Sequence, residues 1–275
     1  MEGCFTLRNN QYGVLALYNT SKKIYSTGLV KLKKTSFGTI KGRVGKNTKN
    51  GNSTLEDLFK YHEKHLKEKK EKIMDLALNN NHWEYFVTLT FDDKEFKNGY
   101  SHEEALKLLR KFIDNQQHQN KGMSYLMVSE FHKSGRLHFH GLFANVPKWK
   151  LKEARYPKSN RLIKENGKQI YNLTNYKLGY TTVSEVESQE KVSNYISKYI
   201  SKELMNLKFK KSFWYSRDLE KPKMDYEYNV LDLKEKYTEN VRYSNDFIRN
   251  DSKIEVLHYT EMSSDTSRSK KTEKC

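Results

Sequence analysis

Two histidines separated by one residue mark a candidate metal site in this chain of 275 residues. They lie in the segment from Arg136 to Leu142, whose alternation of polar and apolar residues predicts a β-strand. Residues i and i+2 of a strand project from the same face, so His138 and His140 lie side by side while the apolar residues point into a core. Two imidazoles in this arrangement can bind one cation, although the pattern also occurs in ordinary surface histidines.

The turn before this strand adds a third candidate ligand. If it is a three-residue loop with Gly135 in the left-handed conformation, the hairpin register places Glu130 opposite His138. Directly opposed residues have Cβ atoms about 4.5 to 5.5 Å apart, so a carboxylate and two imidazoles could converge on one ion. Such a set leaves coordination positions open for water or phosphate, as in a catalytic site. The alternative is a salt bridge from Glu130 to Arg136 or Lys133 on an exposed sheet face.

A tandem Tyr-Ile-Ser-Lys repeat is the second feature that suggests chemistry. In an α-helix with about 100° per residue, its tyrosines and lysines share one arc beside an apolar stripe. These residues are Tyr195, Lys198, Tyr199 and Lys202. A phenol with a pKa of about 10 is a poor nucleophile, but a metal that polarises a phosphate and cations that favour the phenolate make attack feasible at neutral pH. The alternative is a structural amphipathic helix whose tyrosines are half-buried.

The elements that must position these residues follow the order helix, strand, helix, hairpin, insertion, strand, helix. The predicted ranges are a helix over 54–78, a strand over 85–91, a helix from Ser101 to 117, hairpin strands over 124–132 and 136–143, an insertion over 145–178, a strand over 180–186 and a helix over 189–204. This order predicts an α+β domain with a largely antiparallel sheet and helices gathered on one face.

Charge indicates the class of partner. Lysine and arginine number 51 against 34 acidic residues, which gives a formal net charge of +17 and favours a polyanion such as nucleic acid. A membrane is disfavoured, because no run of about 18 apolar residues occurs and the N-terminus lacks the pattern of a signal peptide. The sequence therefore predicts a cytoplasmic protein. With only Cys4 and Cys275 present, neither a disulfide framework nor a cysteine zinc site can form.

The chain divides by composition into three regions. Residues 1–53 are predicted to be a β-rich extension that ends in a basic linker from Lys33 onward. Residues 54–219 are predicted to form the catalytic domain. Residues 220–275 are predicted to be a polar extension, disordered from Ser263 onward.

Several segments together resemble the HUH endonuclease superfamily, and within it the rolling-circle replication initiators of small single-stranded DNA phages and plasmids. Residues 86–91 resemble its first strand motif, and Glu130 with residues 135–141 resembles its metal motif. Residues 195–202 resemble its Tyr-x-x-Lys motif, here doubled. Residues 213–219 resemble a segment downstream of the tyrosines in phage members, so the resemblance covers about residues 83–219.

The resemblance implies a ferredoxin-like or RNA-recognition-like sheet, Mg²⁺ or Mn²⁺, a 5′-phosphotyrosine link and a free 3′-hydroxyl for the host DNA polymerase. It assigns His138, His140 and Glu130 to the metal and Tyr195 and Tyr199 to nucleophilic attack. Lys198 and Lys202 would then steady the scissile phosphate or the phenolate. The predicted DNA contacts are Arg136, Lys133 and Arg217. The predicted partners are single-stranded DNA at a replication origin together with host polymerase and helicase.

Two other functions remain open on the sequence. A transposase or conjugative relaxase of the same superfamily would use the same residues, although relaxases usually have three histidines where this chain offers Glu130. A non-catalytic single-strand-binding module would stack bases on Trp83, Tyr85 and Phe86 but would have no use for paired histidines. Because no Walker-type loop is present, we expect no fused helicase.

Overall fold

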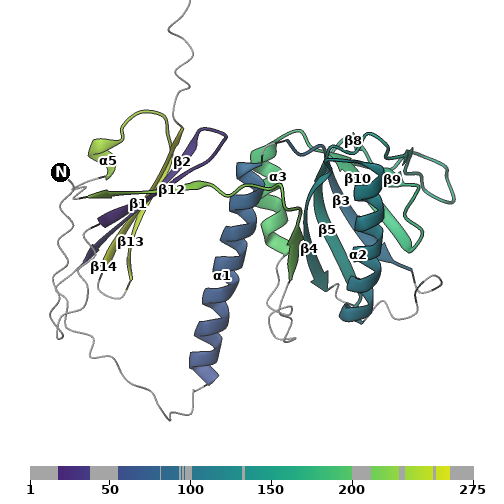
Figure 1. Cartoon of the computed structure of the whole chain (residues 1–275), viewed down its shortest axis with the longest axis horizontal. Coiled ribbons are helices and arrows are strands. Elements are labelled where there is room, and N and C mark those ends of the chain that lie inside the picture. The colour runs from purple at the N-terminus through teal and green to yellow at the C-terminus, as the bar shows by residue number, and fades with distance from the viewer. Residues whose placement is uncertain are drawn as a thin grey trace, which may run out of the picture. The chain divides into compact units, whose positions relative to one another are not determined.

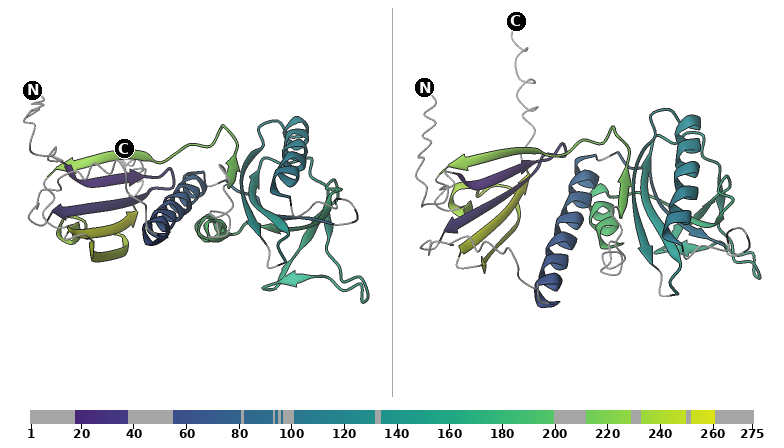
Figure 2. Two further views of the ribbon diagram at one scale, coloured as in Figure 1. Left: turned by 90° about the horizontal axis from the view of Figure 1, so that it is seen from below. Right: turned by 60° about the horizontal axis from the view of Figure 1, so that its bottom comes forward.

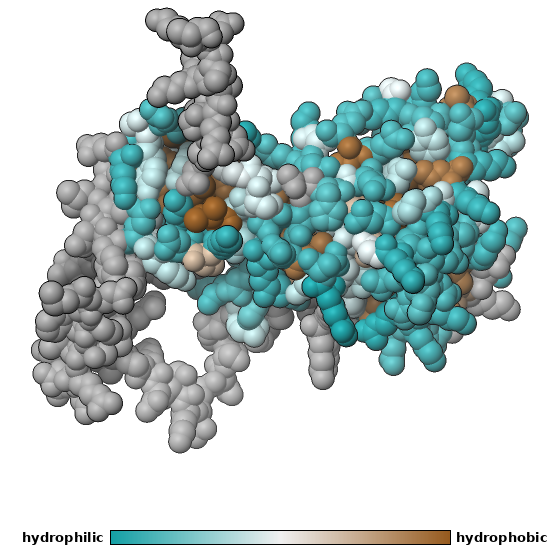
Figure 3. Space-filling model, turned by 45° about the horizontal axis from the view of Figure 1, so that its top comes forward, coloured by the Kyte–Doolittle hydropathy of each residue, from teal (hydrophilic) through white to brown (hydrophobic). Residues whose placement is uncertain are grey.

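The computed structural model divides the chain into two compact units, one of residues 53–221 and the other of residues 1–52 together with 222–275 (Figure 1). The residues that it describes are 18–37, 55–80, 82–92, 94, 96, 101–131, 134–199, 212–228, 233–249 and 252–260. Much of the visible surface of both units is hydrophilic (Figure 3), as the share of charged residues predicts. In the described part of the chain, no helix is both long and apolar enough to cross a membrane.

The larger unit is built around a seven-stranded sheet with the order β11-β4-β5-β3-β10-β9-β6. Every neighbouring pair in this sheet is antiparallel. The elements of the unit are α1 (Leu55–Asn79), β3 (Tyr85–Phe91), α2 (His102–Gln119), β4 (Ser124–Phe131), β5 (Leu137–Ala144), β6 (Leu151–Glu153), β7 (Lys164–Glu165), β8 (Lys168–Gln169), β9 (Tyr171–Leu173), β10 (Gly179–Glu185), α3 (Gln189–Ile196), the 3₁₀ turn η1 (Ser197–Tyr199) and β11 (Phe213–Tyr215). The predicted α+β class is confirmed, and the predicted insertion contributes β6 and β9 to the sheet.

Helices cover both faces of this sheet, so the prediction of helices gathered on one face is wrong. Val87 and Leu89 of β3 pack in a core with Leu109 of α2. Leu126 and Leu142, from the opposite face of β4 and β5, pack with residues of α1 and α3. Figure 2 shows α2 on one side and α1 with α3 on the other. The central strands carry apolar side chains on both faces, and each face must be shielded from water.

The N-termini of two helices are capped by serines. The Ser101 hydroxyl accepts a hydrogen bond from the Glu104 backbone N–H, which confirms the predicted start of α2. Ser188 accepts from the Lys191 N–H in the same way at the start of α3. These caps satisfy backbone donors that have no partner within the helix.

The last helix is shorter than predicted. The sequence predicts a helix over 189–204, whereas α3 ends at Ile196 and continues as the 3₁₀ turn η1. The Ser197 hydroxyl donates to the Asn194 carbonyl, a local bond that competes with the regular helical pattern. Residues 200–211, including Lys202, lie outside the described residues.

Gly179 begins β10 with a φ of 154°, directly opposite Phe91 of β3. A Cβ at this position would lie 2.5 Å from the Asp92 amide nitrogen and closer still to the Thr90 carbonyl oxygen. Gly179→Ala should therefore lower the free energy of unfolding by about 3 kcal/mol, from overlap with backbone atoms and a strained φ angle. Urea denaturation measures this loss.

Gly167→Ala is the matched control, because Gly167 also has a positive φ, 82°, but no atom lies within 4 Å of its added Cβ. It should cost about 1 kcal/mol, the strain of the left-handed conformation alone. Equal losses for the two variants would show that β10 does not pack as closely against β3 as the structure places it.

The smaller unit is a five-stranded sheet with the order β12-β1-β2-β14-β13. Its elements are β1 (Tyr18–Ile24), β2 (Leu29–Phe37), β12 (Lys223–Tyr228), α5 (Leu233–Lys236), β13 (Val241–Arg249) and β14 (Ser252–Thr260). Its core combines Val30 and Leu32 from one end of the chain with Leu233 and Leu257 from the other. The sequence analysis treats the ends as separate extensions, whereas their described parts share one sheet. The predicted linker from Lys33 is correspondingly occupied by β2 as far as Phe37, and the tail from Ser263 lies outside the described residues.

A buried ion pair joins the two ends of the chain in this sheet. Lys34 of β2 is 4% exposed, and its Nζ lies 2.9 Å from Oε2 of Glu255, directly opposite on β14. Glu255→Ala would leave a buried ammonium group without its carboxylate, so we expect the free energy of unfolding to fall by about 3–5 kcal/mol.

The control for this loss is Asp246→Ala, which removes a half-exposed pair with Lys234 in the same sheet. Exposed pairs contribute about 0–1 kcal/mol, so this variant should unfold at nearly the same denaturant concentration as the parent protein. A Glu255→Ala loss no larger than the Asp246→Ala loss would contradict the buried pairing of β2 with β14.

Candidate functional site

The hairpin of β4 and β5 has the predicted register. Gly135 has a φ of 84°, the left-handed conformation that the turn requires. Phe131 lies opposite Leu137, and Glu130 lies opposite His138. A turn of this type therefore brings the carboxylate to the same sheet face as the histidines.

The two histidines alternate with core residues along β5. Leu137 and Phe139 are fully buried against the α2 face of the sheet. His138 and His140 point to the opposite face, where His138 is partly exposed and His140 is 5% exposed. This confirms the alternation inferred from the sequence.

Both ring nitrogens of His140 have partners. Nε2 lies 2.8 Å from Oε2 of Glu130, and Nδ1 lies 3.0 Å from the hydroxyl oxygen of Thr88 on β3. When Nδ1–H donates to Thr88, the lone pair of Nε2 faces the carboxylate and is available to a cation. The sequence analysis missed Thr88 as a site residue, although it lies in the first strand motif and strand alternation could have placed it on this face.

The tyrosine helix lies against the histidine face. The ring of Tyr199 stacks on that of His140, with centroids 3.5 Å apart and an interplanar angle of 20°. The ring of Tyr195 meets that of Tyr199 edge to face, with centroids 5.2 Å apart. Phe86 of β3 contacts both tyrosines, with centroids 5.3 Å from Tyr195 and 6.0 Å from Tyr199. The structure therefore brings together two histidines, a carboxylate and two phenols that lie far apart in the sequence.

The two tyrosines differ in accessibility. The Tyr195 ring is 44% exposed, whereas Tyr199 packs against the core between the sheet and α1. Burial raises the pKa of the Tyr199 phenol well above its usual range, and a hydrogen bond with Tyr195 and the charge of Glu130 raise it further. The 3₁₀ turn advances by about 120° per residue instead of 100°, which turns Tyr199 farther round the axis toward the sheet.

The predicted cationic residues do not all gather at this site. Lys198 is exposed, with its Nζ 5.9 Å from the centroid of the Tyr195 ring. Arg136 donates to the Phe91 carbonyl at 2.8 Å and thus ties the hairpin to the end of β3. Lys133 and Lys202 lie outside the described residues.

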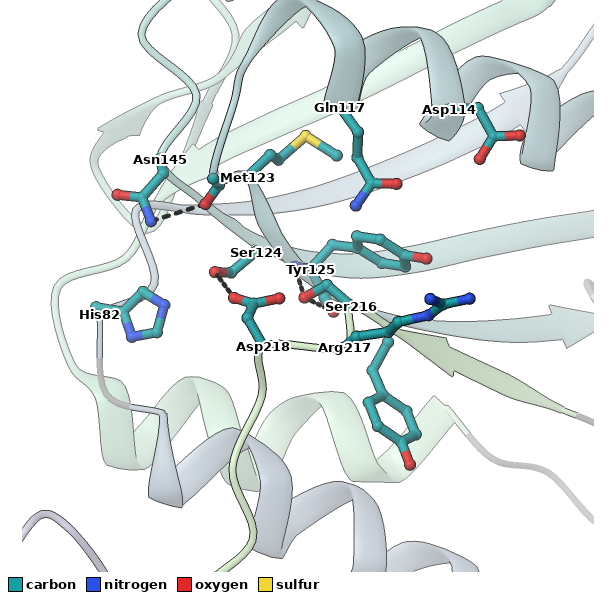
Figure 4. Close-up of a pocket in the computed structure, with 12 residues that line it drawn as sticks. His82, Asp114, Gln117, Met123, Ser124, Tyr125, Asn145, Ser216, Arg217 and Asp218 are labelled. Atoms are coloured by element: carbon teal, nitrogen blue, oxygen red, sulfur yellow. Dashed lines mark hydrogen bonds between the residues drawn. The ribbon is translucent and has the colours of Figure 1, made fainter.

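Arg217 lines a separate pocket at the other end of β4 (Figure 4). In this pocket the Ser124 hydroxyl bonds to Asp218, and the Ser216 hydroxyl accepts from the Tyr125 backbone N–H. Glu130 lies at the far end of the same strand, six residues from Ser124. Arg217 is therefore not part of the cluster of histidines and tyrosines.

The donor types suit a divalent cation, but the side chains are not drawn together around one point. His140 and Glu130 are in contact, while the centroids of the His138 and His140 rings are 6.4 Å apart. Within the described ranges, no group of three or more His, Cys, Asp or Glu side chains is close enough to hold a metal ion. Two imidazoles and one carboxylate on one sheet face still supply the nitrogen and oxygen donors of an open metal site.

This α+β domain presents a histidine hairpin to a tyrosine helix, the arrangement that the sequence resemblance implies for replication initiators. Residues 84–204 match the family model of the ORF2-type replication-associated protein, which fits a rolling-circle replication initiator and confirms that resemblance. No curated protein and no solved structure matches the chain. Glu130, both histidines and both tyrosines lie inside the matched range, whereas Arg217 lies outside it.

Proposed function

We propose that this protein begins rolling-circle replication by nicking one DNA strand with a tyrosine and remaining joined to the 5′ end. The observation that carries the proposal is the stacking of Tyr199 on His140, with Tyr195 beside it. A phenol held against a pair of candidate metal ligands is suited to attack a phosphate bound at those ligands. A core helix without catalytic function would not need this juxtaposition.

In this proposal His138, His140 and Glu130 hold Mg²⁺ or Mn²⁺. The bound cation polarises the scissile phosphate and offsets the charge that develops on its oxygens. The tyrosine oxygen forms a bond to phosphorus while the bond from phosphorus to the 3′ oxygen breaks. The phenolic proton leaves to solvent and the 3′ oxygen takes up a proton, so a 5′-phosphotyrosine and a free 3′-hydroxyl result.

The two phenols take successive roles. Tyr195 makes the first attack because DNA can reach its exposed ring without any rearrangement of the helix. Tyr199 makes the second transfer, which closes the displaced strand after one round of synthesis. Lys198, beside the Tyr195 ring, steadies the phosphate by charge.

The test is covalent capture on single-stranded DNA. Overlapping oligonucleotides that cover both strands of the replicon encoding the chain are incubated with the protein and Mn²⁺, and the mixtures are run on a denaturing gel. We expect one oligonucleotide, or a few overlapping ones, to form an adduct that EDTA prevents. The released fragment should carry a 3′-hydroxyl that a host-type DNA polymerase extends. A folded protein that forms no adduct with any oligonucleotide would contradict the proposal.

Thr88 is proposed as a positioning residue, because its hydroxyl lies against Nδ1 of His140. Partners behind a metal ligand commonly change metal affinity or activity by about 10–100-fold, so Thr88→Ala should lower nicking by that factor at limiting Mn²⁺. Saturating Mn²⁺ should restore much of the lost rate, and Thr88→Ser should retain nearly all of it.

Thr174→Ala is the matched control for Thr88. Its hydroxyl also donates a hydrogen bond, to the Lys150 carbonyl, but at an exposed position outside the site. This variant should nick at the parental rate at every Mn²⁺ concentration. If Thr88→Ala behaved like Thr174→Ala, Thr88 would have no role in orienting His140.

A further inference from the structure

The sheet of the smaller unit separates its charges between its two faces. Residues opposite one another in antiparallel strands share a face. All four acidic residues of the described strands, Asp225, Glu227, Asp246 and Glu255, pair in register with residues of the face that carries Leu32 and Leu257. No acidic residue of the described strands lies on the other face, which we call the lysine face.

Lysines occupy the centre of the lysine face. Lys23 of β1 lies directly opposite Lys31 of β2, and Lys31 in turn lies opposite His258 of β14. Lys33 lies on the same face, two residues beyond Lys31. Like charges directly opposite one another destabilise a sheet, so folding alone does not favour this arrangement. A polyanion that binds across these strands would relieve the repulsion.

Exposed aromatic side chains flank the lysines. Tyr226 of β12 lies opposite Ser21, in the row that contains Lys33, and is 53% exposed. Tyr243 of β13 is 47% exposed, and its ring lies 5.1 Å from that of His258. Burial and the charge of Lys31 lower the pKa of His258 to about 4, so this ring is neutral at physiological pH. The lysine face thus carries positive charge at its centre and aromatic rings on either side.

We propose that the lysine face binds single-stranded DNA, with its lysines on successive phosphates and with Tyr226 and Tyr243 stacking on bases. Cationic grooves with aromatic platforms are the general means of binding single strands without sequence preference. The choice of DNA as the polyanion rests on the proposed function. The strand displaced during replication is the natural occupant, since unpaired bases alone can stack on the tyrosines.

The test compares two triple variants by the salt dependence of their affinity for an unstructured oligonucleotide. Lys23→Gln/Lys31→Gln/Lys33→Gln removes the lysine face. Lys22→Gln/Lys223→Gln/Lys234→Gln removes equal charge without touching it. Each phosphate contact with a single strand contributes about 0.7 to the slope of log K against log salt, so the first triple should lower the slope by about 2. The control triple should leave the slope unchanged.

The aromatic part of the proposal has its own readout. Tyr226→Ala/Tyr243→Ala should weaken single-strand affinity by about tenfold or more, because a stacked base contributes about 1–3 kcal/mol, without changing the salt slope. Melting temperatures verify that the variants fold. The lysine triple should melt no lower than the control triple, because it removes the repulsion between Lys23 and Lys31.

The surface and the nicking function can fail separately. Tyr195→Phe/Tyr199→Phe should lose the covalent adduct but keep the parental salt slope. If the parent protein forms no adduct while the lysine triple still lowers the slope, the nicking proposal fails and the surface stands. If the lysine triple binds single strands like the control triple, or the parent protein prefers duplex to single strands of the same length, the surface proposal is overturned.

Discussion

His138→Ala and His140→Ala should each lower the nicking rate on the order of 10³-fold in Mn²⁺ while affinity for the same oligonucleotide stays nearly unchanged. Cation polarisation of a phosphoryl oxygen contributes several kcal/mol, and each 1.4 kcal/mol is a factor of ten in rate. Affinity comes mainly from lysines and arginines that neutralise phosphates, and the histidine variants leave these in place. Single-turnover cleavage and equilibrium binding of one labelled oligonucleotide measure the two effects.

His118→Ala is the control, because His118 is exposed in the last turn of α2, which covers the opposite face of the sheet. His138→Ala is the more informative of the two site variants, since His138 is partly exposed and contributes less packing than the buried His140. A His138→Ala protein that cleaves at the parental rate with excess Mn²⁺ would show that this histidine does not serve the reaction.

Tyr195→Phe and Tyr199→Phe should each retain some nicking of a single-stranded substrate, whereas the double variant should form no covalent adduct. Phenylalanine keeps the packing of each ring but removes the oxygen that attacks phosphorus. The larger loss of the first nick is expected for Tyr195→Phe, because Tyr195 is the exposed ring and Tyr199 is stacked on His140. Tyr199→Phe should nick but release few closed circles.

Tyr215→Phe is a matched control, since this partly buried tyrosine of β11 packs against the same face of the sheet but outside the tyrosine helix. It should form adducts and release circles at parental rates. Full circle release by either single variant of the helix would mean that one tyrosine performs both transfers.

The hairpin could be predicted from the sequence because its rules are local. The alternation around His138 and the glycine at 135 set both the face and the register, and the structure has the Glu130 to His138 pairing that they imply. The contact of Thr88 with His140 could not be predicted in this way. It depends on β3 lying beside β5, an adjacency between strands about 50 residues apart that alternation within either strand does not specify.

The smaller unit shows the same limit more strongly. β14 pairs with β2 across more than 200 residues, and short polar strands such as β12 carry little hydrophobic signal of their own. Lys34 looks like a surface residue of a basic linker until Glu255 is placed opposite it. Likewise, the 3₁₀ turn that separates the environments of Tyr195 and Tyr199 follows from packing and not from helical periodicity.

Peptide mapping of the covalent adduct tests the central claim most directly. Lysines at 191, 198 and 202 allow trypsin to release residues 192–198, which contain Tyr195, separately from residues 199–202, which contain Tyr199. After nuclease digestion of the bound DNA, mass spectrometry should find a nucleotide phosphate on the first peptide when only the initial nick has occurred. Once strand transfer has proceeded, it should appear on the second peptide as well. An adduct attached to any residue outside these two peptides would contradict the assignment of this helix as the catalytic one.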